Sequence, residues 1–221
     1  MCVLLQAARA VHVQEVDVSV QLGLLPNTFG VITADPPWSY GNAGARGGVD
    51  HHYQTMTDAA IVAMPVHELA APNAALFLWV TNDRLMEGVG ARVARAWGFT
   101  PKMPLTWDKQ RMGVGRTFRG RTEHVIFATR GNLEFPHHNL TTLLDRLPQY
   151  PAEGAMMELP ARTPVHSQKP EEFYALVSHC CPVGPYLELF GRGEERPGWV
   201  KWGNQAEGGI RLPALEAVAG S

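Results

Sequence analysis

Residues 29–38, Phe29-Gly30-Val31-Ile32-Thr33-Ala34-Asp35-Pro36-Pro37-Trp38, decide the fold of this chain. The first six are small, apolar or β-branched, which is typical of a buried strand, and the strand stops at two prolines, which cannot donate to a sheet ladder. Each proline fixes its own φ at about −65° and restricts the residue before it. The segment therefore brings a carboxylate, a rigid stretch of backbone and a flat indole ring to the end of a buried strand.

This corner has two interpretations. In the functional one, Asp35 and the carbonyl of Pro36 accept both hydrogens of an exocyclic amine, and Trp38 stacks on the ring that bears the amine. Methylation of a planar amine needs such a site. In the structural one, the strand ends in a proline turn and Trp38 is a core residue, since Asp-Pro pairs are common turn signals. The corner alone leaves both interpretations open.

The overall composition is that of a soluble globular protein. The 221 residues are 45% hydrophobic and 18% charged, which suits one α/β domain. A net charge of −2 gives no general attraction to nucleic acid, so any such contact must come from a local patch. The three cysteines, Cys2, Cys180 and Cys181, cannot form a disulfide framework. Neither a signal peptide nor a membrane-spanning run is predicted, so we expect a cytoplasmic protein.

Short apolar segments alternate with helix-sized segments, which favours an α/β fold with a mostly parallel sheet and helices on both faces. We expect a single domain over residues 1–221, with a loose tail at 207–221. An insertion is expected at 131–166, where the apolar residues follow neither the helical nor the strand period. The expected strands are 28–34, 74–81, 101–107, 123–129, 185–190 and 198–202, and the expected helices are 57–70, 83–97 and 169–181.

Two further segments have the composition of functional loops. Residues 41–53 carry four glycines directly after the Asp-Pro-Pro-Trp corner, so we expect a gate over the site. In the segment 102–121, glycines alternate with cationic residues, which suits a loop that contacts the phosphate backbone of a nucleic acid, although many such loops are merely solvated. Its charged residues are Lys102, Lys109, Arg111, Arg116, Arg119 and Arg121 against Asp108 alone.

Taken together, eight motifs in order resemble the MT-A70 family of adenine N6-methyltransferases, which includes the catalytic subunit of the eukaryotic mRNA adenine methylase. The resemblance covers roughly residues 17–205, and each motif is weak alone whereas the ordered set is specific. The motifs are Asp35-Pro-Pro-Trp38, Tyr53-Gln-Thr-Met-Thr-Asp58, Leu76-Phe-Leu-Trp-Val-Thr81, Thr106-Trp-Asp-Lys109, Arg121-Thr-Glu-His124, Ser167-Gln-Lys-Pro170, Glu188-Leu-Phe-Gly-Arg192 and Trp202-Gly-Asn-Gln205.

The resemblance implies a Rossmann-like methyltransferase fold with permuted motif order, in which the catalytic strand comes early and the methionine-binding strand late. It implies S-adenosyl-L-methionine as the cofactor and a catalytic corner of Asp35, Pro36, Pro37 and Trp38. The residues that it implies for the cofactor are Asp17, Asp35, Lys169, Phe190, Gly191, Arg192, Asn204 and Gln205. Those expected to contact the substrate are Tyr40, Tyr53, Lys109, Arg111, Arg116, Arg119 and Glu123.

The resulting hypothesis is methylation of adenine N6 in nucleic acid, with DNA favoured over RNA. The compact chain favours a stand-alone bacterial or phage enzyme, and a homodimer or heterodimer stays open. One alternative is a non-catalytic nucleic-acid-binding subunit, which would be expected to lack the Asp35 corner or Lys169. Another is transfer to a protein glutamine amide, as Asn-Pro-Pro-Tyr enzymes do. No metal is expected, because the His51-His52 and His137-His138 doublets lack the usual ligand spacings.

Overall fold

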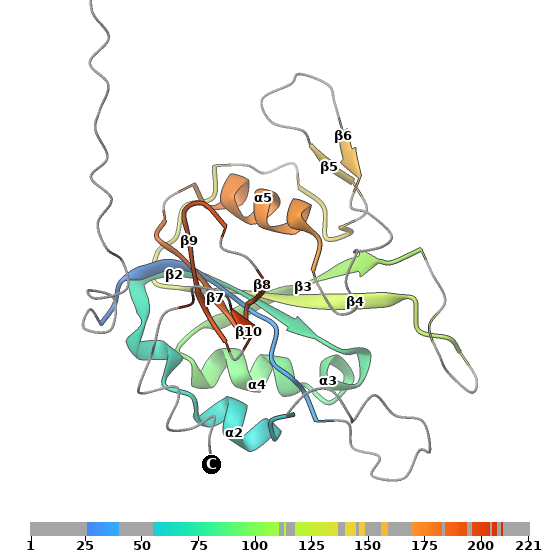
Figure 1. Cartoon of the computed structure of the whole chain (residues 1–221), viewed down its shortest axis with the longest axis horizontal. Coiled ribbons are helices and arrows are strands. Elements are labelled where there is room, and N and C mark those ends of the chain that lie inside the picture. The colour runs from blue at the N-terminus through green and yellow to red at the C-terminus, as the bar shows by residue number, and fades with distance from the viewer. Residues whose placement is uncertain are drawn as a thin grey trace, which may run out of the picture.

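The computed structural model describes residues 26–39, 55–110, 113, 118–136, 140–144, 146–148, 156–158, 169–182, 184–193, 196–203, 205–206 and 209. Its centre is a six-stranded sheet in the order β3-β4-β2-β1-β7-β9 (Figure 1). All six predicted strands are present, and the largest boundary difference is at the start of β2. The strands are β1 (Phe29–Ala34), β2 (Ala70–Val80), β3 (Thr100–Asp108), β4 (Thr122–Arg130), β7 (Tyr186–Leu189) and β9 (Trp199–Trp202).

The sheet has a parallel part and an antiparallel part. β1 runs parallel to β2 and β7, and β7 runs parallel to β9, whereas β4 runs antiparallel to both β2 and β3. The sequence analysis did not predict this antiparallel hairpin. The sequence of residues 109–121, which join β3 to β4, has three glycines and no apolar helical pattern, so it gives no signal for the crossover helix that a parallel connection needs. The predicted α/β fold with a mostly parallel sheet is otherwise confirmed.

Two of the predicted helices are shorter than expected. The helix predicted over 57–70 is α2 (Asp58–Ala63), followed only by the 3₁₀ turn η2 (Val66–Glu68). Pro65 is the reason, because Met64 before it takes an extended backbone with ψ of 131° and so ends the helix. The helix predicted over 83–97 is divided into α3 (Asn82–Met86) and α4 (Val89–Ala96). It breaks at Gly88, whose φ of 67° is left-handed.

The predicted third helix is α5 (Glu171–Cys180), for which Pro170 supplies the N-cap residue and two glutamates the first turn. Figure 1 shows α5 on one face of the sheet and α2, α3 and α4 on the other. Among the helices of the described residues, none combines the length and apolar character needed to cross a membrane.

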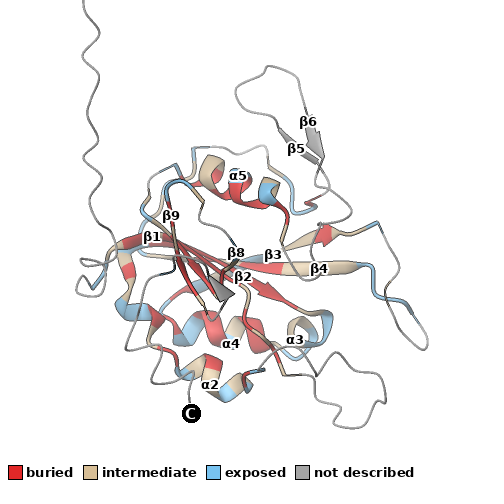
Figure 2. Ribbon diagram, viewed as in Figure 1, coloured by how far each residue is buried: buried red, intermediate tan, exposed pale blue. Residues whose placement is uncertain are grey.

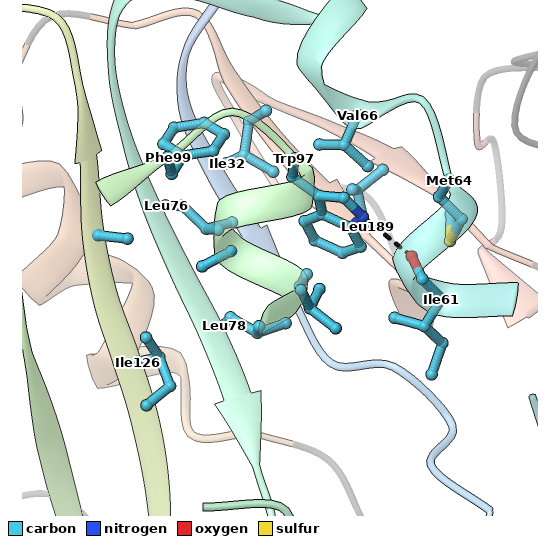
Figure 3. Packing of buried hydrophobic residues seen from close by; sticks show 14 of the residues in the cluster. Ile32, Ile61, Met64, Val66, Leu76, Leu78, Trp97, Phe99, Ile126 and Leu189 are labelled. Atoms are coloured by element: carbon cyan, nitrogen blue, oxygen red, sulfur yellow. Dashed lines mark hydrogen bonds between the residues drawn. The ribbon is translucent and has the colours of Figure 1, made fainter. Parts of the chain in front are cut away.

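Each face of the sheet has its own hydrophobic core, and Figure 2 shows the buried residues concentrated along the strands and the inner sides of the helices. Under α4 and α2, the indole N–H of Trp97 donates to the carbonyl of Ile61 at 2.9 Å (Figure 3). Gly90 lets α4 approach closely, because a Cβ there would lie 2.6 Å from Cγ1 of Val80. Under α5, Phe173 and Val177 are fully buried against the other face.

The segment predicted as an insertion, 131–166, contains a short antiparallel pair, β5 (Arg146–Pro148) and β6 (Met156–Glu158). It also returns to the main sheet: Leu143 forms an isolated bridge with Thr106, and Leu144 is buried in the core under α5. A second short pair, β8 (Arg192–Gly193) and β10 (Gln205–Ala206), is parallel. Apart from Gly209, the predicted tail 207–221 lies outside the described residues, as does the predicted gate 41–53.

Candidate active site

Asp35 lies where the parallel strands end. It directly follows β1, and its backbone N–H donates to the carbonyl of Leu189, the last residue of β7, at 3.4 Å. Phe190 comes next after β7 and has a φ of 62°, which turns the chain away from the sheet at once. Because ligands of open α/β sheets bind at the carboxyl ends of the strands, this edge is the expected place for a site.

The backbone of the Asp-Pro-Pro-Trp corner is held by Met56, which lies just before the N-cap of α2. The carbonyl of Pro37 accepts from Met56 N–H at 2.8 Å, and Ser39 N–H donates to the Met56 carbonyl at 3.2 Å. The carbonyl of Pro36 accepts from Trp38 N–H at 2.8 Å, which leaves it one further lone pair for a substrate amine. The corner is thus rigid before any substrate arrives.

Trp38 is packed differently from the predicted stacking role. Its side chain belongs to the core under α2 and α4 and is 6% exposed, and its indole N–H donates to the Trp79 carbonyl at 3.0 Å. A ring so deeply buried offers no open face to a base, so the structure favours the packing interpretation of Trp38 over the stacking one.

Two carboxylates and two ammonium groups meet beside Asp35, and we call Asp35, Lys109, Glu123 and Lys169 the Lys169 cluster. Lys169 Nζ lies 3.3 Å from Asp35 Oδ2 and 2.8 Å from Glu123 Oε2. Lys109 Nζ lies 3.0 Å from Glu123 Oε1. The Lys169 ammonium also lies 4.7 Å from the ring centroid of Trp79, a cation–π distance. The four groups come from four separate parts of the chain: the ends of β1 and β3, the start of β4 and the residue before the α5 cap.

The two carboxylates of the Lys169 cluster have pKa values that are shifted in opposite directions. Burial, reinforced by the negative charge of Glu123, raises the pKa of Asp35 above its ordinary value, although Lys169 opposes this shift. Burial acts on Glu123 in the same direction, but the ammonium groups of Lys169 and Lys109 outweigh it and lower the pKa of Glu123 to about 2. The two carboxylates likewise outweigh burial at Lys169 and raise the pKa of its ammonium. Asp35 is therefore the carboxylate of the cluster that takes up a proton most readily.

A second ionic group lies next to the first, and we call Glu171, Tyr174, Glu188, Arg196 and Lys201 the Glu188 cluster. Glu188 Oε1 accepts from the Tyr174 hydroxyl at 2.6 Å and its Oε2 from Arg196 at 2.9 Å. Arg196 also pairs with both oxygens of Glu171, at 2.7 and 2.8 Å, and lies 3.4 Å from the ring centroid of Tyr174. Lys201 Nζ lies 3.8 Å from Glu188.

A shallow, open pocket lies between the two clusters. Charged groups of both signs and two aromatic residues line it, which suits a zwitterionic ligand that carries a flat ring. Its lining residues are Asp35, Lys169, Glu171, Tyr174, Glu188, Phe190, Arg192 and Arg196. Among the residues that the structure describes, no three His, Cys, Asp or Glu side chains are grouped as metal ligands.

Arg84 of α3 joins the two ends of the segment 40–54. Its guanidinium donates to the Ser39 carbonyl on one side and lies 3.1 Å from Asp58 Oδ1 on the other. The side chain is only 11% exposed and also contacts Glu87 at 2.9 Å. The chain between Ser39 and the start of α2 therefore leaves and returns at nearly the same point beside the corner.

The structure brings together part of the predicted site. Asp35, Lys169, Phe190 and Arg192 line the pocket, and Glu123 and Lys109 complete the Lys169 cluster. Gly191 donates its N–H to the Trp202 carbonyl at 3.0 Å and supports the turn after β7.

Other predicted residues are not in the cluster or not described. Arg119 lies in the β3–β4 hairpin, where it donates to the Gly113 carbonyl at 2.8 Å. Gln205 is described only as part of the backbone of β10. Outside the described residues lie Asp17, Tyr40, Tyr53, Arg111, Arg116 and Asn204.

Sequence reasoning missed the roles of Tyr174, Arg196 and Arg84. Glu188 carried a usable signal, because a carboxylate inside the apolar strand Tyr186–Leu189 must find partners when it is buried. Arg196 carried none, since an arginine in a Pro-Gly turn reads as a surface residue.

A mixed sheet with an acidic corner at the carboxyl end of its central strand is typical of Rossmann-like α/β proteins. The chain belongs to the MT-A70 family, whose model matches residues 29–205. The resemblance stated from the motifs is thus confirmed, and with it the Rossmann-like α/β fold of the S-adenosylmethionine-dependent methyltransferases.

Curated proteins of three kinds are similar to this chain. An N(6)-adenosine-methyltransferase MT-A70-like protein of Drosophila melanogaster is 33% identical over 86% of this chain and 29% of its own length. The human N(6)-adenosine-methyltransferase catalytic subunit METTL3 is 30% identical over 86% of this chain and 30% of its own length. Human N(6)-adenine-specific methyltransferase METTL4 is 27% identical over 80% of this chain and 37% of its own length. The chain therefore spans about a third of the length of these relatives.

Proposed function

We propose that this protein is an S-adenosylmethionine-dependent methyltransferase that methylates N6 of adenine in nucleic acid. The observation that carries the proposal is the position of Asp35: a carboxylate with a raised pKa at the end of β1, on a rigid corner, lining a pocket with charges of both signs. Family membership and the names of the three relatives support the same reaction.

The residues of the pocket fit the proposed cofactor, which supplies an activated methyl group when bound. Its amino-acid end carries one ammonium and one carboxylate, and the pocket offers Asp35 for the first and Lys169 for the second. Phe190 offers an aromatic surface at the turn after β7. Asp17, Asn204 and Gln205 remain the proposed contacts to the rest of the cofactor.

Besides binding the cofactor, Asp35 has two tasks toward the acceptor amine in this proposal. With the free lone pair of the Pro36 carbonyl, it accepts hydrogen bonds from the amine, which stabilises the positive charge that develops on nitrogen as the methyl group is transferred. The amine then loses one proton to Asp35 or to water. A raised pKa suits a carboxylate that must be ionised before the transfer and accept a proton after it.

The proposed acceptor is an unpaired or flipped adenine, because N6 inside a duplex cannot reach a pocket. We favour DNA over RNA, and the experiment below compares both, since the relatives' names refer to adenine in one case and adenosine in the others. The β3–β4 hairpin supplies the proposed phosphate contacts through Lys109, Arg119 and its neighbours. We also propose an intracellular location, with which the free, buried thiols of Cys180 and Cys181 agree.

The test is transfer of label from radioactive S-adenosylmethionine to matched single- and double-stranded DNA and RNA, followed by digestion to nucleosides. Label in N6-methyldeoxyadenosine supports the DNA enzyme, and label only in N6-methyladenosine moves the activity to RNA. Cofactor binding without transfer to either would contradict a stand-alone enzyme. Failure to bind the cofactor would favour a non-catalytic subunit instead.

A further inference from the structure

The tip of the β3–β4 hairpin presents a lone aromatic ring to solvent. The side chain of Phe118 is 95% exposed. Residues 118–121 are all exposed, and Figure 2 shows this part of the hairpin extending away from the sheet. Burying a phenylalanine side chain gains about 1.5–3 kcal/mol, so a chain that folds without using this ring leaves that free energy for a ligand.

The hairpin is braced around Phe118. At its base, Arg121 forms two hydrogen bonds with the Asp108 carboxylate, at 2.5 and 2.6 Å, and these lower the pKa of Asp108. At its tip, Gly113 N–H donates to the Gly120 carbonyl at 2.7 Å. A Cβ at Gly113 would lie 2.7 Å from that same carbonyl oxygen, so only glycine allows this approach. Arg119 adds a hydrogen bond from its guanidinium to the Gly113 carbonyl.

The position of the hairpin connects the ring to the candidate site. Lys109 N–H donates to the Arg121 carbonyl, while the Lys109 ammonium binds Glu123 of the Lys169 cluster. Phe118 is five residues before Glu123 on the same arm, so their Cα atoms lie within about 17 Å of each other at about 3.3 Å per extended residue. This distance corresponds to a few nucleotides of a strand whose adenine reaches Asp35.

The surroundings favour nucleic acid over a protein partner. Arg119 directly follows the ring and donates only to the uncharged Gly113 carbonyl among the hydrogen bonds described, and the sequence of the hairpin adds further cations, so a polyanion is the complementary ligand. The other large exposed apolar side chains of the described residues are Met86, Met103 and Leu143, and none of them is in the hairpin tip. Among the described residues of the hairpin tip, Phe118 is the one large exposed apolar side chain, so no contiguous apolar surface of the kind found in protein interfaces is present there, whereas a stacked base needs only one ring face.

We propose that Phe118 stacks on a base that flanks the target adenine and replaces the stacking lost when that adenine leaves its neighbours. This inference rests on the proposed function. Stacking on an aromatic side chain tolerates any base and contributes about 1–3 kcal/mol, which is about 5-fold to 150-fold in affinity. The ring thus strengthens binding next to the target without reading sequence.

The test measures binding of the full chain to a fluorescent single-stranded 12-mer with one adenine, at several salt concentrations, for F118A, F118Y and R119E. We expect F118A to weaken binding at least 5-fold with an unchanged salt dependence, because no charge is removed, and F118Y to bind like the wild type. R119E is expected to reduce both the affinity and the salt dependence. In a second measurement, 5-iodouracil is placed in turn at each of the first few positions on either side of the adenine, and from at least one of them it is expected to crosslink to the peptide that contains Phe118.

Wild-type affinity in F118A, or crosslinks that all map elsewhere, would overturn the inference. So would sedimentation data showing that the wild type is a dimer and F118A a monomer, since the ring would then bind a second chain. If the wild type itself neither binds nor methylates either nucleic acid, the proposed function has failed. If the wild type methylates and F118A equals it in Kd and KM, the role of Phe118 alone has failed.

Discussion

The Lys169 cluster and the Glu188 cluster lie on either side of one pocket, yet Glu188 and Asp35 differ in how completely their oxygens are paired with donors. In the Glu188 cluster, both oxygens of Glu188 accept short hydrogen bonds, from Tyr174 and Arg196, and the side chain is 10% exposed. In the Lys169 cluster, Asp35 has its nearest ammonium at 3.3 Å and is 28% exposed.

This difference separates a structural network from a reactive one. A fully bonded carboxylate gains nothing from a ligand, whereas one that is incompletely paired and opens to a pocket still has acceptor capacity to offer. The pKa directions agree, because Asp35 binds a proton more readily than an ordinary aspartate. We therefore expect the Glu188 cluster to determine stability and Asp35 to determine turnover.

The largest expected effect is on the stability of the Glu188 cluster. Glu188→Gln keeps the shape of the side chain but leaves Arg196 and Lys201 without their buried counter-charge, so it should lower the free energy of unfolding by about 3–5 kcal/mol. The matched control is Glu171→Gln, whose carboxylate contacts the same Arg196 but is 62% exposed, and which should cost about 1 kcal/mol or less. Equal losses in urea denaturation would contradict the structural role of Glu188.

A loss of turnover is expected from a substitution in the Lys169 cluster, on the other side of the pocket. Asp35→Ala removes the proposed acceptor of the amine hydrogens and should lower kcat by about 100-fold to 1000-fold or abolish it. Its Tm should change little, since a raised pKa means that the folded state does not favour the charge. Asp83→Asn, an exposed carboxylate on α3, is the control. Wild-type turnover in Asp35→Ala would remove Asp35 from the reaction.

A smaller effect is expected in the acid stability that Glu123 confers. Its folded-state pKa of about 2 lies below its ordinary value of 4.5, so its contribution is complete above pH 4.5 and is lost as the pH falls toward 2. The wild type should lose on the order of 1–3 kcal/mol more than Glu123→Gln across this interval. Urea midpoints at several acid pH values measure the difference, and parallel curves for the two proteins would argue against the ion pairs of Glu123.

The smallest effect distinguishes the neighbours of Asp35. Lys169→Met removes the charge that opposes protonation and should raise the Asp35 pKa further, whereas Glu123→Gln removes a negative neighbour and should lower it. Carbon NMR of labelled aspartate carboxyls, assigned with Asp35→Asn, follows both shifts. An unchanged Asp35 pKa in both variants would show that burial alone sets it.

Sequence reasoning predicted which helices and strands exist better than it predicted where they end or which residues they contact. Strand β1 and its proline corner were predictable, because burial and proline act on adjacent residues. The break at Gly88 and the short α2 were not, since a glycine or proline inside a periodic pattern does not reveal whether the helix bends, breaks or continues. Trp38 shows the same limit of sequence reasoning, because the Asp-Pro-Pro-Trp sequence is compatible both with a ring that stacks on a base and with a ring that packs in the core.

The sequence by itself determined the α/β fold class, the family and the delivery of Asp35 to a strand end, since these follow from local burial patterns, proline chemistry and ordered motifs. Only the tertiary structure decided which charges meet there. Lys169 and Glu123 are 46 residues apart and touch because the start of the antiparallel β4 and the residue before the α5 cap both lie beside the end of β1. Long-range contacts of this kind depend on how the sheet is ordered, which no local pattern specifies.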